Sequence, residues 1–104
     1  MAVIHVTSEN FDQEVLQSKQ PVLLDFWASW CGPCMMLGPV VEELAGEVTD
    51  AKICKINVDE QPELAMQFRV ANIPMLVVMK NGKVVAKDVG VKNKAELLEM
   101  LKAE

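Results

Sequence analysis

Apolar segments of two different periods alternate along the 104 residues, and this pattern predicts a compact α/β domain. Residues 22–28, VLLDFWA, form a continuous apolar run of strand length, as expected for a central strand covered on both faces. Further strands are predicted over residues 3–6 and 52–59. Residues 75–80 and 83–89 flank an Asn-Gly pair that favours the tight turn of a β-hairpin.

Helical spacing separates these strands. Thr7 or Ser8 is expected to cap a first helix, and residues 34–44 predict a second helix that is kinked, not ended, at Pro39. Pro62 opens a short third helix, and Asn93 with Glu96 forms a variant of the capping box ahead of the last one. The order is therefore β-α-β-α-β-α-β-β-α. We expect the helix-linked strands to pair in parallel, with antiparallel hairpin strands at one edge.

Length and composition narrow the class of protein. Residues 1–104 are enough for one domain, and a composition that is 51% apolar builds a core without a metal or crosslink. Ten basic and fifteen acidic side chains give a net charge of −5, and the lysines are scattered along the sequence, so nucleic acid and anionic membranes are poor partners. The first ten residues lack the features of a secretory leader, and no apolar run is long enough to span a membrane. Three cysteines cannot all pair, which favours a reducing compartment. We expect a soluble protein in the reducing cytoplasm.

Cys31 and Cys34 stand where the central strand ends and the second helix begins, separated only by Gly32 and Pro33. The pair could hold a metal, form a static crosslink or exchange electrons. Unpaired N–H groups and the positive end of the helix dipole favour a thiolate at Cys31, which should be the nucleophile. Cys34 lies one turn further on the same face and is positioned to resolve a mixed disulfide. Gly32 leaves the sulfur accessible and Pro33 pre-sets the helical φ; because neither is charged, the pair should be a reductant.

The stretch WCGPC resembles the active-site signature of the thioredoxin family. The resemblance continues through DFWASWCGPC, KINVD, NIPMLVVMKNGK and VG to the terminal helix, in the order and spacing of that family. It implies the thioredoxin fold, a five-stranded mixed sheet flanked by four helices. It also implies reduction of disulfides in protein substrates by dithiol–disulfide exchange, re-reduction by a thioredoxin reductase, a monomer, and no cofactor beyond the Cys31–Cys34 disulfide.

Asp25 lies inside the apolar run, where burial should raise the pKa of its carboxyl. The resemblance implies a buried proton acceptor beneath Cys34, whereas the alternative is an aspartate that reaches water. Lys55 matches a lysine found near that aspartate in relatives, although strand alternation also allows a solvated side chain. Trp27 is expected to support the same site.

The resemblance also implies a substrate-docking surface. The Ile73-Pro74 bond is expected to be cis and to lie against the sulfurs, which leaves the backbone of Ile73 free to pair with an extended peptide. The surrounding surface would be formed by Trp30, Ile73, Pro74, Gly90 and Val91. For Ile73 and Val91, burial in the core is the alternative.

The sequence departs from the family at three positions and carries an additional cysteine. Met35 stands where lysine or arginine is common, Gly38 replaces an alanine, and Met75 replaces a threonine. Loss of the cation leaves the thiolate pKa and reduction potential open, and Met75 should make the docking groove more apolar. Cys54 is interpreted as a buried structural thiol, not a third redox centre.

Two other classes of function remain as alternatives. Three cysteines and His5 formally make a zinc set, but only Cys31 and Cys34 have ligand-like spacing, so we expect no metal. A non-catalytic module that only binds partners is the second alternative. Such modules commonly lose a cysteine, and this chain keeps both.

Overall fold

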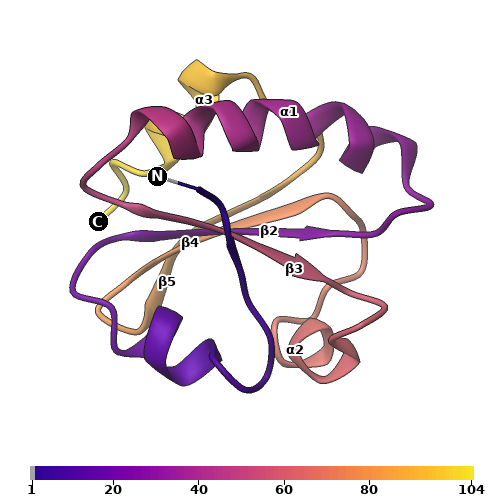
Figure 1. Cartoon of the computed structure of the whole chain (residues 1–104), viewed down its shortest axis with the longest axis horizontal. Helices are drawn as coiled ribbons and strands as arrows, with labels where there is room; N and C mark the ends of the chain where they lie inside the picture. The colour runs from indigo at the N-terminus through magenta and orange to yellow at the C-terminus, as the bar shows by residue number, and fades with distance from the viewer. Residues whose placement is uncertain (1) are drawn as a thin grey trace.

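The computed structural model describes residues 2–104 and builds them into five strands and four helices (Figure 1). The elements in chain order are β1 Ile4–His5, η1 Asp12–Leu16, β2 Val22–Trp27, α1 Gly32–Glu47, β3 Lys52–Asn57, α2 Pro62–Gln67, β4 Met75–Lys80, β5 Lys83–Val89 and α3 Lys94–Met100. The predicted α/β class and element order are confirmed. Within these residues, no helix is both long and apolar enough to cross a membrane.

The sheet is mixed, with the strand order β1-β3-β2-β4-β5. Strands β1 and β2 both run parallel to β3, while β4 is antiparallel to β2 and β5 is antiparallel to β4. The apolar run of β2 occupies the centre, and five of its six residues are buried. This position explains its continuous hydrophobic sequence, because a central strand has no face left for water.

The expected arrangement is confirmed: β1, β2 and β3 pair in parallel, and the β4–β5 hairpin adds antiparallel strands at one edge. The connection that contains the six-residue helix α2 stays at the end of the sheet where β3 finishes (Figure 1), and β4 starts from that same end. As a result, Phe26 near the end of β2 pairs with Met75 at the start of β4.

Helices cover both faces of the sheet. Helices α1 and α3 pack on one face and η1 and α2 on the other (Figure 1), so the molecule has two apolar layers. Along β2, Leu23 enters the layer beneath α1, whereas Leu24 and Phe26 enter the layer that contains η1 and α2. By alternation, Asp25 has the same orientation as Leu23 and faces α1.

Local sequence signals are confirmed at three of the four places where they were strongest. Helix α1 continues through Pro39 without ending, and Asn81 and Gly82 form the hairpin turn with φ of 53° and 75°. Asn93 and Glu96 form the complete capping box of α3. The expected cap by Thr7 or Ser8 is wrong. The helix begins after Phe11, with no side-chain cap, because the Thr7 hydroxyl oxygen instead accepts the N–H of Glu9 at 3.2 Å, in a turn where the Asn10 carboxamide oxygen accepts the Thr7 N–H at 2.7 Å.

Candidate active site

Cys31 and Cys34 form a disulfide at the junction of β2 and α1, with their Cα atoms 5.2 Å apart. Cys31 is the N-cap residue of α1 and Cys34 lies in the first turn. The backbone N–H of Cys34 donates to the Cys31 sulfur at 3.2 Å. Cys31 is 6% exposed and Cys34 only 2%, so solvent reaches Cys31 first. The sulfur of Cys31 thus occupies the position where an N-cap oxygen usually accepts, at the positive end of the helix.

Gly32 and Pro33 both lie on the surface of the first helical turn. A side chain at Gly32 would contact no atom within 4 Å, so packing does not require glycine there. Pro33 occupies a position whose N–H has no partner within the helix, as predicted. These two residues leave one side of the disulfide open to a large molecule.

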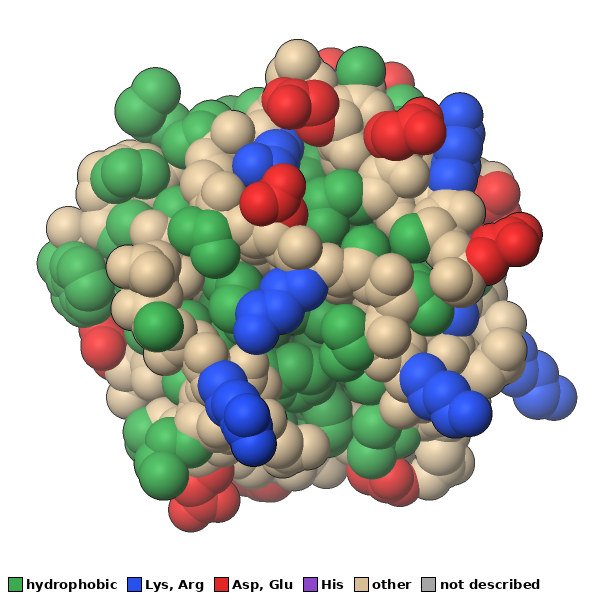
Figure 2. Space-filling view, turned by 180° about the vertical axis from the view of Figure 1, so that it is seen from behind, with side chains coloured by type: hydrophobic (Ala, Val, Ile, Leu, Met, Phe, Trp, Pro, Cys, Tyr) green, Lys and Arg blue, Asp and Glu red, His purple; other side chains and the backbone are tan. Residues whose placement is uncertain are grey.

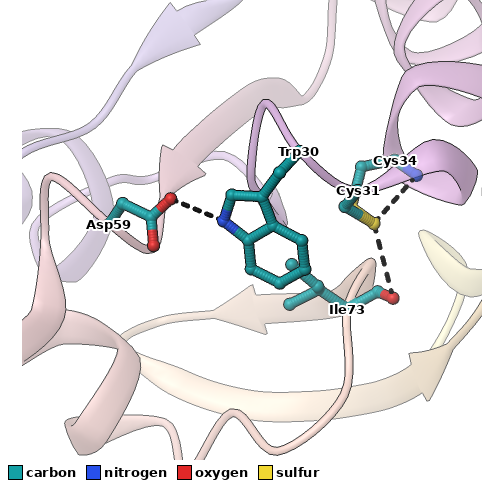
Figure 3. The surroundings of a disulfide bond; sticks show 5 residues. All are labelled: Trp30, Cys31, Cys34, Asp59 and Ile73. Atoms are coloured by element: carbon teal, nitrogen blue, oxygen red, sulfur yellow. Dashed lines mark hydrogen bonds between the residues drawn. A yellow bond between two sulfur atoms is a disulfide. The ribbon is translucent and has the colours of Figure 1, made fainter.

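A second segment reaches the disulfide from the start of β4. The Ile73-Pro74 peptide bond is cis, and the carbonyl oxygen of Ile73 lies 3.8 Å from the Cys31 sulfur (Figure 3). Pro74 is buried and Ile73 is half-buried. The carbonyl of Pro74 accepts the N–H of Gly90 at 2.9 Å, and Gly90 has a φ of 109° that favours glycine. Val91, which follows, is 42% exposed and is therefore not a core residue.

Trp30 projects into solvent immediately before the disulfide and is 69% exposed. Its indole N–H donates to Asp59 Oδ2 at 2.8 Å (Figure 3). Asp59 is the last residue of the KINVD stretch, and the sequence alone indicates no role for it. The side chain of Asn57 accepts the backbone N–H groups of Asp59 and Glu60, which holds the turn that presents this carboxylate. This bond fixes the orientation of an otherwise exposed aromatic ring.

The methionines of the site differ in exposure. Met35 and Met36 on the first turns of α1 are 44% and 67% exposed, so this part of the surface is apolar beside the disulfide. Met75 is only 1% exposed and packs in the layer beneath η1 and α2. The expectation that Met75 makes the docking groove more apolar is therefore wrong, because its side chain points into the core.

Asp25 lies beneath α1 with no solvent exposure, and neither of its carboxyl oxygens has a hydrogen-bond partner among residues 2–104. Removal from water raises the pKa of this carboxyl to about 7, and the positive charge of Lys55 opposes that rise. Asp25 pairs with Lys55 in the register of β2 and β3. Burial of Asp25, which the sequence suggested, is confirmed.

Lys55 lies beside Asp25 on the sheet face that α1 covers. Its Nζ lies 4.4 Å from the centre of the Trp27 ring, a cation–π contact. A side chain at Gly38, one turn beyond Cys34, would come within 3.9 Å of the same Nζ. Trp27 also packs against the cluster of Ala28, Cys31 and Cys34. Lys55 is thus half-buried in this layer, and the alternative of a fully solvated side chain is wrong.

Cys54 is fully buried in the layer on the opposite face of the sheet. Burial raises the pKa of its thiol to about 12, which keeps it protonated and inert at neutral pH. His5 is exposed on β1. Within residues 2–104, no group of three or more histidine, cysteine or acidic side chains is arranged to hold a metal.

This arrangement suits thiol–disulfide exchange. The Cys31 sulfur is largely shielded from solvent but can be reached beside an apolar surface, and Cys34 lies one helical turn behind it. The buried carboxyl of Asp25, which titrates near neutral pH, lies in the layer beneath α1. An attacking thiolate is favoured at the helix N-terminus, and a nearby carboxylate can accept a proton.

Comparisons with a family model and with individual known proteins all point to the same family. The family model described as Thioredoxin matches residues 2–103. A protein named thioredoxin from Mycobacterium bovis is 50% identical over 101 residues, which cover 96% of this chain and 87% of that protein. A thioredoxin from Staphylococcus haemolyticus is 48% identical over 102 residues, 97% of this chain and 96% of that protein. A bifunctional thioredoxin reductase/thioredoxin from Mycobacterium leprae is 46% identical over 99 residues, 94% of this chain and 22% of that protein.

Proposed function

The chain belongs to the thioredoxin family and is a thiol–disulfide oxidoreductase that reduces protein disulfides through Cys31 and Cys34, and we propose the role of each site residue in that reaction. Cys31 is the nucleophile and Cys34 the resolving thiol. The observation that carries this assignment is the N-cap position of Cys31, whose sulfur accepts the N–H of Cys34 and is the more exposed of the two.

The reaction follows as two exchanges. The Cys31 thiolate attacks one sulfur of the substrate disulfide, which forms a mixed disulfide and releases the other substrate sulfur as a thiolate. Cys34 then loses its proton and attacks the Cys31 sulfur, which closes the Cys31–Cys34 disulfide and releases the second substrate thiolate. Two electrons pass from the protein to the substrate. The uncharged Gly32-Pro33 pair favours the direction in which this protein is the reductant.

Asp25 accepts the proton that Cys34 loses. Two features support this role: its complete burial in the layer beneath α1, and a pKa of about 7, which lets the carboxyl take up a proton at neutral pH. Lys55 and Trp27 support Asp25. The ammonium group favours the carboxylate form, and the indole ring beneath it holds that ammonium in place.

The docking surface consists of the residues around the open side of the disulfide. Those assigned to it are Trp30, Gly32, Pro33, Ile73, Pro74, Gly90 and Val91. Exposure of Trp30 and Val91, and the short distance from Ile73 to Cys31, support this assignment. Buried Pro74 acts by holding Ile73 and Gly90 in position, since its carbonyl accepts the Gly90 N–H.

The partner that re-reduces the Cys31–Cys34 disulfide is a thioredoxin reductase. The support is that the relative from Mycobacterium leprae combines both names in one chain. We further propose a monomeric, single-domain protein of the cytoplasm that acts on disulfide-containing proteins and needs no bound cofactor or metal.

Trapping of a mixed disulfide tests the assignment of the two sulfurs. A Cys34→Ser variant should still attack a disulfide substrate such as insulin and then accumulate as a covalent adduct, visible by mass spectrometry and released by dithiothreitol. A Cys31→Ser variant should form no adduct and should not reduce insulin. Both variants should unfold at similar urea concentrations. If Cys31→Ser forms the adduct and Cys34→Ser does not, the two roles are reversed.

A further inference from the structure

An apolar groove of about 340 Å³ lies away from the active site, between η1, the end of α2 and the β4–β5 hairpin. Its floor contains Phe11, Phe68, Val77 and Met79, which belong to the layer on that face of the sheet. Val84 of β5 lines it and is 51% exposed. None of the groove residues takes part in the proposed redox reaction.

The groove exists because the helices on this face stop short of the sheet edge. Strand β5 is the outermost strand beyond β4, and a register irregularity between Val78 and Met79 interrupts its pairing. Val84 and Lys87 pair with Met79 and Val77, so all four side chains point toward the same face. Neither η1 nor α2 covers the β5 part of that face.

Cations border this groove. Arg69, just after α2, and Lys87 on β5 both line it, and both are exposed. Among residues 2–104 neither forms a salt bridge, in contrast to Lys52, Lys92, Lys94 and Lys102. Figure 2 shows this side of the molecule, with Lys and Arg side chains around a hollow that has a hydrophobic floor and with acidic side chains mainly near the outline.

The charge around the groove is opposite to that of the protein. Lys19, Lys80 and Lys83 line two neighbouring hollows beside the hairpin and also form no salt bridge within the described chain. Lysines that are dispersed in the sequence are thus gathered around the β4–β5 hairpin of a chain whose net charge is −5, with Lys80 and Lys83 on the face of the hairpin opposite the groove, where Glu104 also lies. An anion is attracted to this hairpin although the molecule as a whole repels it.

The backbone conformation of Arg69 gives a second reason to regard the groove as functional, and this reason does not depend on charge. Its φ is 54°, in the left-handed region, which glycine adopts without steric cost and in which an arginine backbone is strained. A residue that merely ends α2 would be less costly as glycine. The position instead holds a long cationic side chain at the border of an apolar groove, and strained non-glycine residues tend to occur at functional positions.

We propose that this groove binds a small amphipathic organic anion, with its apolar part on the Phe11, Phe68 and Met79 floor and its carboxylate beside Arg69 and Lys87. The volume lies at the lower end of the roughly 300–1,000 Å³ usual for small-molecule sites. A folded partner would need about 800 Å² of complementary surface on each side, far more than this groove offers. Addition of a peptide strand to β5 is opposed by its lysines and by the register irregularity, which are features that protect sheet edges.

Titration of the ¹⁵N-labelled protein with sodium decanoate, followed by amide NMR spectra, tests the proposal. Saturable shifts should appear at Arg69, Lys87 and the floor residues, and not at Trp30 or Gly90. Decan-1-ol, which lacks the charge, should bind more weakly. Absence of saturable shifts at the groove, or shifts centred on the apolar surface around the disulfide, would overturn the proposal.

Variants separate the groove from general attraction by surface charge. An Arg69→Gly, Lys87→Gln double variant should bind decanoate roughly tenfold more weakly, because charge-assisted hydrogen bonds to the carboxylate are lost. Lys83→Gln removes one charge from the same strand, outside the groove, and should bind almost as the parent does. Equal losses in the double variant and in Lys83→Gln would overturn the proposal.

Two control measurements, the urea midpoint and the rate of insulin reduction, show whether weaker decanoate binding reflects the groove itself. Arg69→Gly alone should raise the urea midpoint, since it relieves the left-handed strain, and should still weaken binding. Weakened binding then cannot be explained by loss of fold. Insulin reduction should be unchanged in all of these variants, so the groove and the redox site are tested independently. A gain in stability with unchanged decanoate affinity would overturn the role of Arg69.

Discussion

Replacement of Asp25 by asparagine removes a buried ionisable group from the layer beneath the active-site helix. The carboxyl has no hydrogen-bond partner in the described chain and has a folded pKa of about 7, against an ordinary value of 3.8. A raised folded pKa means that folding is less favourable when Asp25 is a carboxylate than when it is protonated. The contribution of Asp25 to stability is therefore intact below pH 3.8 and is lost progressively as the pH rises to about 7.

The size of this loss follows from the two pKa values. Each tenfold change in an ionisation constant corresponds to about 1.4 kcal/mol, so the shift from 3.8 to about 7 amounts to roughly 4 kcal/mol above pH 7. Asparagine recovers only part of this energy, because burial of an unpaired amide costs about 1–3 kcal/mol. Asp25→Asn should therefore be more stable than the parent by roughly 1–3 kcal/mol at pH 7.5, with little or no advantage at pH 4.

The clearest readout is the pH dependence of the difference between the two proteins. Urea unfolding of both oxidised proteins from pH 3.5 to 8 should give a difference in the free energy of unfolding that grows by about 1.4 kcal/mol per pH unit across the window. The slope does not depend on how well asparagine packs, because asparagine does not titrate. Asp50→Asn, at an exposed position, is the matched control and should show no such slope.

Activity should change in the opposite direction. Without a proton acceptor, Asp25→Asn should resolve the mixed disulfide roughly tenfold more slowly, or worse, at pH 7. Stopped-flow decay of a preformed adduct measures this step directly. A pH-independent stability difference would refute the burial argument. A steep stability slope with an unchanged rate of resolution would show that Asp25 is buried and titrates but accepts no proton from Cys34.

Two further predictions concern residues on β3. Cys54→Ala should lower the free energy of unfolding by about 1 kcal/mol and leave insulin reduction nearly unchanged; a large loss of activity in the folded variant would contradict its structural role. Because Lys55 opposes the rise in the pKa of Asp25, Lys55→Met should move that pKa above about 7 and extend the pH window in which stability falls. Urea unfolding as a function of pH measures this shift, and an unmoved window would show that Lys55 does not interact with the carboxyl.

The parts of the fold that the sequence predicts well are those specified by neighbouring residues. The Asn81-Gly82 turn needs two consecutive residues that tolerate positive φ, and the capping box of α3 needs Asn93 and Glu96 three residues apart. The N-terminal position of Cys31 on α1 follows from its place between an apolar strand and a helical pattern. Each of these signals acts within one turn, so no tertiary information is needed to interpret it.

The features that the sequence did not predict depend on contacts between distant segments. The bond from Trp30 to Asp59 requires the loop after β3 to lie beside the end of β2. The collection of cations around the β4–β5 hairpin requires knowledge of which side each lysine faces. The side-chain cap of the first helix was predicted wrongly from local sequence, because the Thr7 hydroxyl has more than one local hydrogen-bonding option and accepts the N–H of Glu9.

The antiparallel direction of β4 is what assembles the candidate site. Because β4 is antiparallel to β2, its first residue, Met75, lies opposite Phe26, near the end of β2. Ile73 precedes that start and so reaches the Cys31 sulfur, which follows the end of β2. In a parallel arrangement, β4 would begin at the opposite end of the strands, ~20 Å away for strands of six residues. Its backbone could then not contact the disulfide. The α2 connection, which stays at one end of the sheet, therefore brings a backbone acceptor beside the reacting sulfur.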